Sequence, residues 1–426
     1  MSLSLGVTDA SSTSVAGPVG PTFAELGLPD DLVAVLAARR ITHPLPIQAA
    51  TIPDALAGRD ISGKAPTGSG KTLAFCLPLA TRLPKAKAYR PTALILAPTR
   101  ELASQIADEL RPLLKAKHRR AHAFYGGIGF GAQIAALRSG VDVVVACPGR
   151  LEDLISQGHV QLSEVRMVVI DEADRMADMG FLPAVRRLMD RTAPDRQTLL
   201  FSATLDGDID VLVQRYQRQP ARHEVETPDD EVANATHQFH AVAREDRAAR
   251  CAELVTEAGP TVVFVRTKHG ADRLARQLER SGVPAVAIHG DRSQAQRDRA
   301  LATFKSGKAW ALVATDVAAR GIHVDGVACV LHYDLAGEAK DYVHRSGRTA
   351  RNGAEGLVIS LVSPDERGAA RQLVRQLGLS IEMVGDHGPD QGAARAASPR
   401  RNRPAGGGYQ GPRPASGARR RAHSGR

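Results

Sequence analysis

Cysteines, aromatic residues and long apolar runs are all scarce in this sequence of 426 residues. No cysteine lies in a CxxC pair, so neither a disulfide framework nor a cysteine-based zinc site is expected, and the isolated thiols fit a reducing compartment. No apolar run approaches the roughly 20 residues that cross a bilayer. The first 20 residues also lack the basic and apolar regions of a signal peptide. We therefore expect a cytoplasmic protein without a membrane partner.

The excess of positive charge is concentrated in one segment. The formal net charge is +10, and residues 391–426 hold nine arginines with no lysine, aspartate or glutamate, so residues 1–390 carry only +1. Arginine, glycine, proline and alanine dominate that segment, a composition that cannot build a core. Any nucleic-acid contact in the folded part must therefore come from individual residues and not from a broad basic field.

Two series of short apolar runs alternate with amphipathic stretches, which is typical of parallel sheets covered by helices. We therefore predict an α/β fold with more than one domain. The first series has predicted strands at Ala93–Thr99, Asp142–Gly149, Arg166–Asp174 and Gln197–Thr204. The second has them at Pro260–Thr267, Pro284–Gly290, Trp310–Asp316, Ala328–Asp334 and Gly356–Ser363.

The segment APTGSGKT has the spacing of a phosphate-binding P-loop, with alanine in place of the first glycine. Its glycines let successive N–H groups point at an anion, the lysine reaches the β- and γ-phosphates, and the threonine hydroxyl ligates Mg²⁺. A turn with a solvated lysine is the alternative for so short a motif. The predicted nucleotide-binding residues are Ala65, Pro66, Thr67, Gly68, Ser69, Gly70, Lys71 and Thr72.

Two carboxylates, Asp171 and Glu172, directly follow a predicted buried strand. Open α/β sheets bind their ligands at such strand ends. Asp171 can hold Mg²⁺ through water, and Glu172 can orient and deprotonate the attacking water. The alternative is a pair of acids that cap the next helix. With a P-loop about a hundred residues upstream, the pair predicts a nucleoside triphosphatase.

The sequence Asp171–Asp174 reads DEAD, and further motifs occur around it in a characteristic order. Together they resemble the DEAD-box ATP-dependent RNA helicases of superfamily 2, over about residues 22–384. The excess of arginine over lysine and the basic tail resemble the bacterial RhlE type. The motifs are PLPIQ (Pro44–Gln48), PTRELA (Pro98–Ala103), GG (Gly126–Gly127), PGR (Pro148–Arg150), SAT (Ser202–Thr204), ATDVAARG (Ala314–Gly321) and HRSGRTAR (His344–Arg351).

The resemblance implies two tandem RecA-like domains with mainly parallel sheets. The predicted segments are a disordered lead (1–20), a Q-motif region (21–49), a RecA-like ATP-binding domain (50–222), a linker (223–235), a RecA-like C-terminal helicase domain (236–384) and a disordered basic tail (385–426).

The resemblance also assigns roles at the nucleotide. Gln48 would read adenine, since a carboxamide can donate and accept at once. Arg348 and Arg351 would act as arginine fingers beside Lys71 and Glu172, which completes the predicted catalytic set. Phe23 either stacks on the base or packs before the first helix. The coupling residues would be Ser202, Thr204, Asp174 and His344, with helix capping as the alternative for the two hydroxyls.

On the RNA side, the resemblance implies contacts with the phosphate-ribose backbone, which position a strand without reading its sequence. Each of these positions could instead be an ordinary loop residue. The implied RNA-binding residues are Thr99, Arg100, Gly127, Gly149, Arg150 and Thr315. Implied partners are structured or double-stranded RNA, with ribosomal or RNA-decay proteins as further candidates.

The sequence departs from the family pattern at several positions. Arg40 and Ile41 stand where glycine and an aromatic residue are usual, Cys147 replaces a threonine, and His323 replaces an aspartate that contacts the ribose. We expect these departures to weaken ATP affinity or closure without abolishing hydrolysis. The predicted function is ATP- and Mg²⁺-dependent, non-processive local unwinding of RNA. An ATP-gated RNA clamp and a DNA translocase are the alternatives.

Overall fold

A computed structural model describes residues 20–66, 68–205, 207–225, 235–319, 327–350, 356–379 and 383–384. Residues 1–19 of the predicted lead, the predicted tail, and the positions Thr67, His323 and Arg351 lie outside these ranges. Residues 20–225 form the first lobe and residues 235–384 form the second lobe, each with its own sheet. Within the described residues, no helix is both long and apolar enough to span a membrane.

The first lobe is built on a seven-stranded sheet in which all neighbouring strands run parallel. The strand order is β3-β4-β2-β5-β6-β1-β7. This order places β1 beside β6 and β6 beside β5. The strands are β1 (Ile61–Lys64), β2 (Ala93–Leu96), β3 (Ala121–Phe124), β4 (Val143–Ala146), β5 (Met167–Asp171), β6 (Gln197–Ser202) and β7 (Ala221–Glu224).

The second lobe repeats this topology with another parallel sheet, in the order β10-β11-β9-β12-β13-β8-β14. Numbered from its own first strand, the order is the same as in the first lobe, which matches two tandem RecA-like domains. The strands are β8 (Ala235–Ala241), β9 (Thr261–Phe264), β10 (Ala285–Ile288), β11 (Ala311–Ala314), β12 (Cys329–His332), β13 (Gly356–Val362) and β14 (Met383–Val384).

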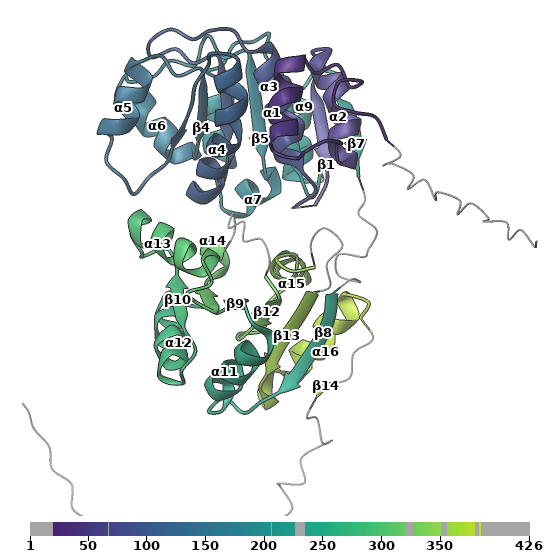
Figure 1. The fold of residues 1–426 in the computed structure, drawn as a ribbon, viewed down its shortest axis with the longest axis vertical. Coiled ribbons are helices and arrows are strands. Elements are labelled where there is room, and N and C mark those ends of the chain that lie inside the picture. The colour runs from purple at the N-terminus through teal and green to yellow at the C-terminus, as the bar shows by residue number, and fades with distance from the viewer. Residues whose placement is uncertain are drawn as a thin grey trace, which may run out of the picture. The chain divides into compact units, whose positions relative to one another are not determined.

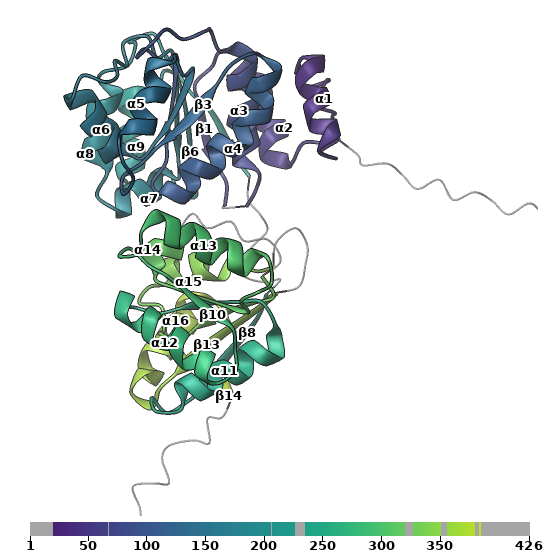
Figure 2. The same ribbon diagram turned by 60° about the vertical axis from the view of Figure 1, so that its left-hand side comes forward.

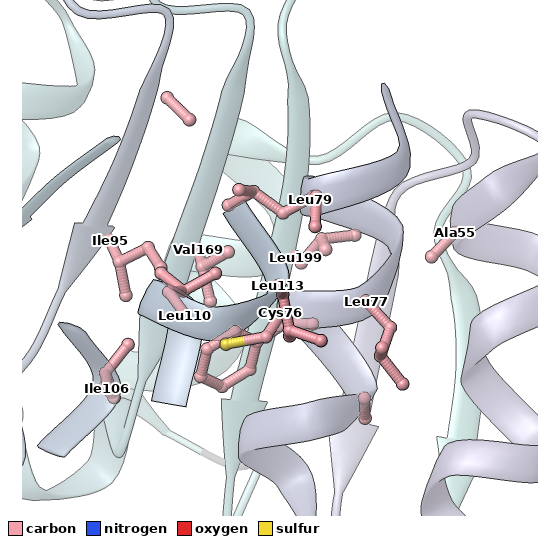
Figure 3. Close-up of a cluster of buried hydrophobic side chains, with 14 of the residues drawn as sticks. Ala55, Cys76, Leu77, Leu79, Ile95, Ile106, Leu110, Leu113, Val169 and Leu199 are labelled. Atoms are coloured by element: carbon pink, nitrogen blue, oxygen red, sulfur yellow. The ribbon is translucent and has the colours of Figure 1, made fainter. Parts of the chain in front are cut away.

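Helices cover both faces of the first sheet (Figures 1 and 2). One face packs against α1 (Asp30–Ala38), α2 (Pro46–Leu56), α3 (Lys71–Arg82) and α4 (Arg100–Ala116). Figure 3 shows part of that core, where Leu77 and Cys76 of α3 lie near Leu110 and Leu113 of α4. The other face packs against α5 (Gly131–Arg138), α6 (Pro148–Ser156), α7 (Ala173–Asp178), α8 (Leu182–Met189) and α9 (Asp208–Tyr216).

The second sheet is likewise covered on both faces. One core contains side chains of α11 (Arg247–Ala258) and α12 (Lys268–Arg280). The other contains side chains of α13 (Gln294–Lys305), α14 (Asp316–Ala319), α15 (Ala339–Ser346) and α16 (Arg367–Gln376), with a short 3₁₀ turn, η1 (Pro364–Glu366), before α16.

The predicted linker over residues 223–235 is shorter in the structure. β7 continues to Glu224, and Val225 N–H still donates to Lys64 O at 2.9 Å. β8 begins at Ala235. Residues at both ends of the predicted linker are therefore paired in the two sheets. Residues 226–234 lie outside the described ranges. The division into domains otherwise stays a prediction.

Candidate active site

The P-loop connects β1 to α3 at the carboxyl edge of the first sheet. Gly68 and Gly70 have φ values of +94° and +88°, a backbone conformation that side chains disfavour, so both glycines are required by the turn. Lys71 is buried, and its Nζ donates to Ala65 O at 2.8 Å. The lysine therefore folds back on its own loop, in a position from which it can turn to a phosphate.

Gln48, predicted to read adenine, lies against this loop. Its side chain is only 2% exposed. Its Oε1 accepts from Leu45 N–H at 2.9 Å, and its Nε2 donates to Gly70 O at 3.0 Å. The carboxamide thus links the start of α2 to the last glycine of the P-loop, a contact that sequence reasoning did not anticipate. Phe23 is buried in the first core, which favours the packing alternative for that residue.

Asp171 ends β5 and is almost fully buried beside Lys71 and Glu172. Its Oδ1 accepts the Glu172 N–H at 3.0 Å. Burial raises the pKa of Asp171 to about 7, while Lys71 acts to lower it and the Glu172 and Asp174 carboxylates act to raise it. A buried carboxylate of this kind is short of positive charge, and a bound cation would supply it.

Glu172 has a left-handed backbone, with φ at +52°, at the point where the chain turns from β5 into α7. Its carboxylate forms an ion pair with Arg175, three residues on, and both side chains are 9% exposed. Burial acts to raise the pKa of Glu172, but the charges of Arg175 and Lys71 outweigh it, and the pKa lies below its ordinary value. Glu172 is therefore ionised at neutral pH, as a general base must be.

Ser202 joins three motifs at the end of β6. Its carbonyl oxygen accepts from Ala65 N–H of the P-loop at 3.1 Å. Its hydroxyl oxygen accepts from Asp174 N–H of the DEAD sequence at 3.2 Å. Neighbouring strands bring these groups together, because β1 and β5 both pair with β6. Thr204 follows in the same loop and is half-buried.

Asp171 and Thr72 carry donors of the kind that fit a magnesium ion. The Asp171 carboxylate and the Thr72 hydroxyl, at the start of α3, are hard oxygen ligands such as Mg²⁺ prefers. Burial outweighs the charge of Lys71 and raises the pKa of Asp171 to about 7, so a cation beside the carboxylate would favour its ionised form. These two residues are the ones that would hold the ion, together with the phosphates of the nucleotide.

Two of the predicted RNA-binding residues touch each other. The Arg100 guanidinium lies against Gly127, so closely that a side chain at Gly127 would overlap it, with an ideal Cβ only 2.1 Å from Nη1. Gly127 also has φ at +81°. Arg150, 9% exposed, donates to Ile128 O at 3.0 Å and lies over the Phe130 ring at 4.1 Å. The loop after β3 thus gathers both arginines.

The three remaining predicted RNA-binding residues lie in different surroundings. The Thr99 hydroxyl accepts from Leu102 N–H at 3.3 Å and caps α4, which is the ordinary alternative role of such a residue. Gly149, in α6, is exposed with open space around it. Thr315 is buried between β11 and α14 in the second lobe.

In the second lobe, the turn after α15 carries Arg348, which is buried, and α15 itself carries the half-buried His344. Arg345, which we expected to be structural, forms a two-point ion pair with Asp316 at 2.6 and 2.8 Å and also donates to Asp334 O. Its role as a brace between α15 and α14 is therefore clear. The second predicted arginine finger, Arg351, lies outside the described residues.

Sequence reasoning missed two residues of these sites, Arg175 and Phe130. Arg175 could have been found from its spacing, because residues three apart share a helix face. Phe130 offers no such signal, since only the fold brings it beneath Arg150.

Comparison with known proteins agrees with this geometry. Residues 45–212 match the family described as DEAD/DEAH box helicase, and residues 245–353 match the helicase conserved C-terminal domain. DEAD-box ATP-dependent RNA helicase 30 of Arabidopsis thaliana is 41% identical over 370 residues, which are 85% of this chain and 63% of that protein. DEAD-box ATP-dependent RNA helicase 20 of the same plant is 38% identical, over 89% of this chain and 77% of that protein.

Solved structures are similar as well. Saccharomyces cerevisiae Dbp5, bound to RNA and ADP BeF3, aligns with a TM-score of 0.75 and 29% identity, over 86% of this chain and 96% of that one. A DEAD box protein from Methanococcus jannaschii aligns with a TM-score of 0.51 and 35% identity, over 85% of this chain and 99% of that one. The chain spans slightly under two thirds of the length of the first plant relative.

Proposed function

Since the chain belongs to the DEAD-box helicase family, we propose that it is an RNA-stimulated ATPase that locally unwinds or remodels RNA. The observation that carries this proposal is the meeting of three motifs at Ser202, which bonds both the P-loop and the DEAD sequence. A change at the terminal phosphate would be transmitted through this residue. The proposal therefore links hydrolysis to the strand-separating step.

The chain's own residues account for the chemistry. The P-loop amides and Lys71 bind the phosphates, and the ionised Glu172 takes the proton of the attacking water. Arg348 and Arg351 would stabilise the charge that develops on the transferred phosphoryl group. Mg²⁺, held by Thr72 and Asp171, supplies further positive charge when it is bound. Gln48 would favour adenine while it keeps its link to Gly70.

We propose RNA backbone contacts for Arg100, Gly127 and Arg150, and for Thr99, Gly149 and Thr315. The RNA bound to yeast Dbp5 supports RNA as the ligand. Backbone contacts would give little sequence preference. Ribosomal or RNA-decay proteins remain proposed partners, and the cytoplasm is the proposed location.

The finer assignment, to the bacterial RhlE type, is also a proposal. It is supported by an arginine-rich composition and by the short core with a basic tail. The relatives compared above are plant proteins, so this assignment depends on composition alone.

The proposal is tested by measuring ATP hydrolysis and the separation of a short RNA duplex with the purified chain, with and without RNA. We expect RNA to stimulate hydrolysis and ATP to drive separation. Glu172→Gln should abolish repeated turnover. Retained single-round separation in that variant would favour the clamp alternative, and equal stimulation by single-stranded DNA would favour a translocase. Hydrolysis that is indifferent to RNA, without any strand separation, would refute the proposal.

A further inference from the structure

A second charged site lies in the first lobe, at the amino ends of the strands and away from the P-loop edge. Its main cavity has a volume of about 610 Å³. The residue before β1 and the first residues of β5 and β6 contribute to its wall. Five arginines line it: Arg59, Arg82, Arg166, Arg196 and Arg218.

Two of the five arginines are paired with aspartates, Arg59 with Asp54 at 2.8 Å and Arg166 with Asp195. Asp60 is buried and accepts two backbone N–H groups, from Thr198 at 2.7 Å and from Arg218 at 2.6 Å. Asp195 is exposed and pairs with Arg166. Asp60 forms no ion pair in the described part of the chain, but its negative charge acts on Arg196.

Three of the arginines are held by neutral oxygens. Arg82 donates to Ala55 O and to a glutamine side chain, Arg196 to Ala193 O at 3.1 Å, and Arg218 to Pro194 O at 2.6 Å. In the described part of the chain, no carboxylate forms an ion pair with any of these three. Each guanidinium is therefore fixed in place with donors to spare.

Arg196 shows most clearly that a partner is lacking. Its Nε is buried and, within the described residues, has no hydrogen-bond partner. Burial also lowers the pKa of Arg196. Leaving a buried charged donor unsatisfied is costly, and an anion in the cavity would stabilise the charge of this guanidinium.

A smaller cavity of about 330 Å³ continues the site, because Arg196 and Arg218 line both spaces. It adds Arg215 together with Asp190, its ion-pair partner at 3.2 Å. The aromatic residue in its wall, Tyr216, is buried, and its hydroxyl bonds Asp190 at 2.9 Å. No exposed aromatic face is therefore offered on which a base could stack, unlike in single-strand binding grooves.

We propose that these two adjoining cavities, called here the basic cleft, bind an anion with several consecutive phosphate groups. The guanidinium fork matches phosphate oxygens at two points. The volume is within the range of small-ligand pockets. Consecutive phosphates occur in a free polyphosphate and along the backbone of an RNA duplex, and the cleft would recognise either by the same chemistry. This inference does not depend on the proposed helicase activity.

The test titrates inorganic tripolyphosphate into the full chain by calorimetry, in a Lys71→Ala background that weakens the P-loop as a competing site. We expect Arg166→Gln and Arg218→Gln each to weaken binding about tenfold and to lower the salt slope by about one. Arg166 is 60% exposed, so its replacement should not affect folding. The matched control is Arg111→Gln, which removes another exposed arginine paired with an aspartate, on α4.

A second titration adds a blunt RNA duplex. Competition with tripolyphosphate would identify the RNA backbone as the source of the phosphates, and no competition would identify a small polyphosphate. Equal affinity in the two cleft variants, the control and the parent would overturn the inference. The cleft variants, made with Lys71 intact, should keep RNA-stimulated ATP hydrolysis. Loss of anion binding in the basic cleft can therefore be distinguished from loss of the proposed helicase function.

Discussion

The hydroxyl of Ser202 accepts the backbone N–H of Asp174 at 3.2 Å, and this bond joins the end of β6 to the first turn of α7. Both residues are buried. The Asp174 N–H belongs to a helix start, where intrahelical partners are lacking. The serine therefore satisfies a donor that the helix itself cannot.

Ser202→Ala should leave that N–H unsatisfied and lower the free energy of unfolding by about 1–3 kcal/mol. Because the bond links the motif that holds Glu172, the proposed general base, to the neighbouring strand, duplex separation should fall more than ATP hydrolysis. The ratio of the two rates is the measurement. Ser62→Ala is the control, since this buried hydroxyl of β1 donates to the side chain of Gln217, the residue after α9, which lies outside the motifs. An equal ratio in the two variants would show that Ser202 has no coupling role.

Asp171→Asn should stabilise the protein in the absence of nucleotide and cation, although it removes activity. The pKa of Asp171 is raised from about 4 to about 7. The protonated Asp171 therefore contributes its whole share to the free energy of unfolding below about pH 4, and this contribution is lost as the pH rises through about 7. The asparagine stays neutral, so its advantage in urea unfolding should be larger at pH 8 than at pH 5.

Asp142→Asn provides the contrast for this experiment. The Asp142 carboxylate accepts backbone N–H groups from Ala86 at 2.7 Å and from Arg120 at 2.8 Å. Its replacement should destabilise the protein, because the amide is a poorer acceptor. If Asp171→Asn also destabilised the protein at pH 8, the idea that the buried, ionised Asp171 carboxylate destabilises the folded state would be refuted.

The sequence predicted the central strands of both sheets and the positions of the motifs at their carboxyl ends. It did not predict β1, whose residues Ser62 and Gly63 have low strand propensity. Pairing with β6 on one side and β7 on the other holds this strand in the sheet. The edge strand β7 was not predicted either, because its residues Ala221–Glu224 are mostly polar.

At the site, spacing identified the P-loop and the two carboxylates, because short motifs fix their own geometry. The bond between Gln48 and Gly70 could not be foreseen, since it spans 22 residues and depends on how α2 packs on α3. The ion pair of Glu172 was foreseeable from the three-residue spacing to Arg175.

Arg175→Gln should shift the pH dependence of ATP hydrolysis. Arg175 helps to hold the pKa of Glu172 below its ordinary value, so its loss should raise that pKa. If Glu172 is the general base, as we propose, it would then be protonated at a higher pH, and the acid limb of the kcat profile should move toward neutrality. Arg187→Gln is the control, because its exposed pair with Glu152 is remote from the motif. An unmoved acid limb would show that Arg175 has no influence on the base.

Arg40→Gly should raise the free energy of unfolding by about 1 kcal/mol. Arg40 has φ at +60°, where the resembled family usually has glycine. This conformation ends α1, since Ile41 N–H bonds back to Leu36 O at 3.0 Å. Glycine adopts it without strain, whereas Arg40→Ala removes the side chain and keeps the strain. Thermal or urea unfolding should therefore show a gain for glycine alone, and an equal gain for alanine would refute the backbone explanation.

Deleting residues 391–426 should weaken RNA binding and flatten its dependence on salt. This segment holds nine arginines. If all of them contacted single-stranded phosphates, the logarithm of affinity would fall against the logarithm of salt with a slope of about −6. Hydrolysis without RNA should be unchanged, because the P-loop, Asp171 and Glu172 all lie in the first lobe. A variant with the nine arginines replaced by glutamine keeps the length of the tail and separates charge from chain length. The salt slope of that variant should match the deletion, and a slope equal to that of the full chain would show that the tail charges do not touch RNA.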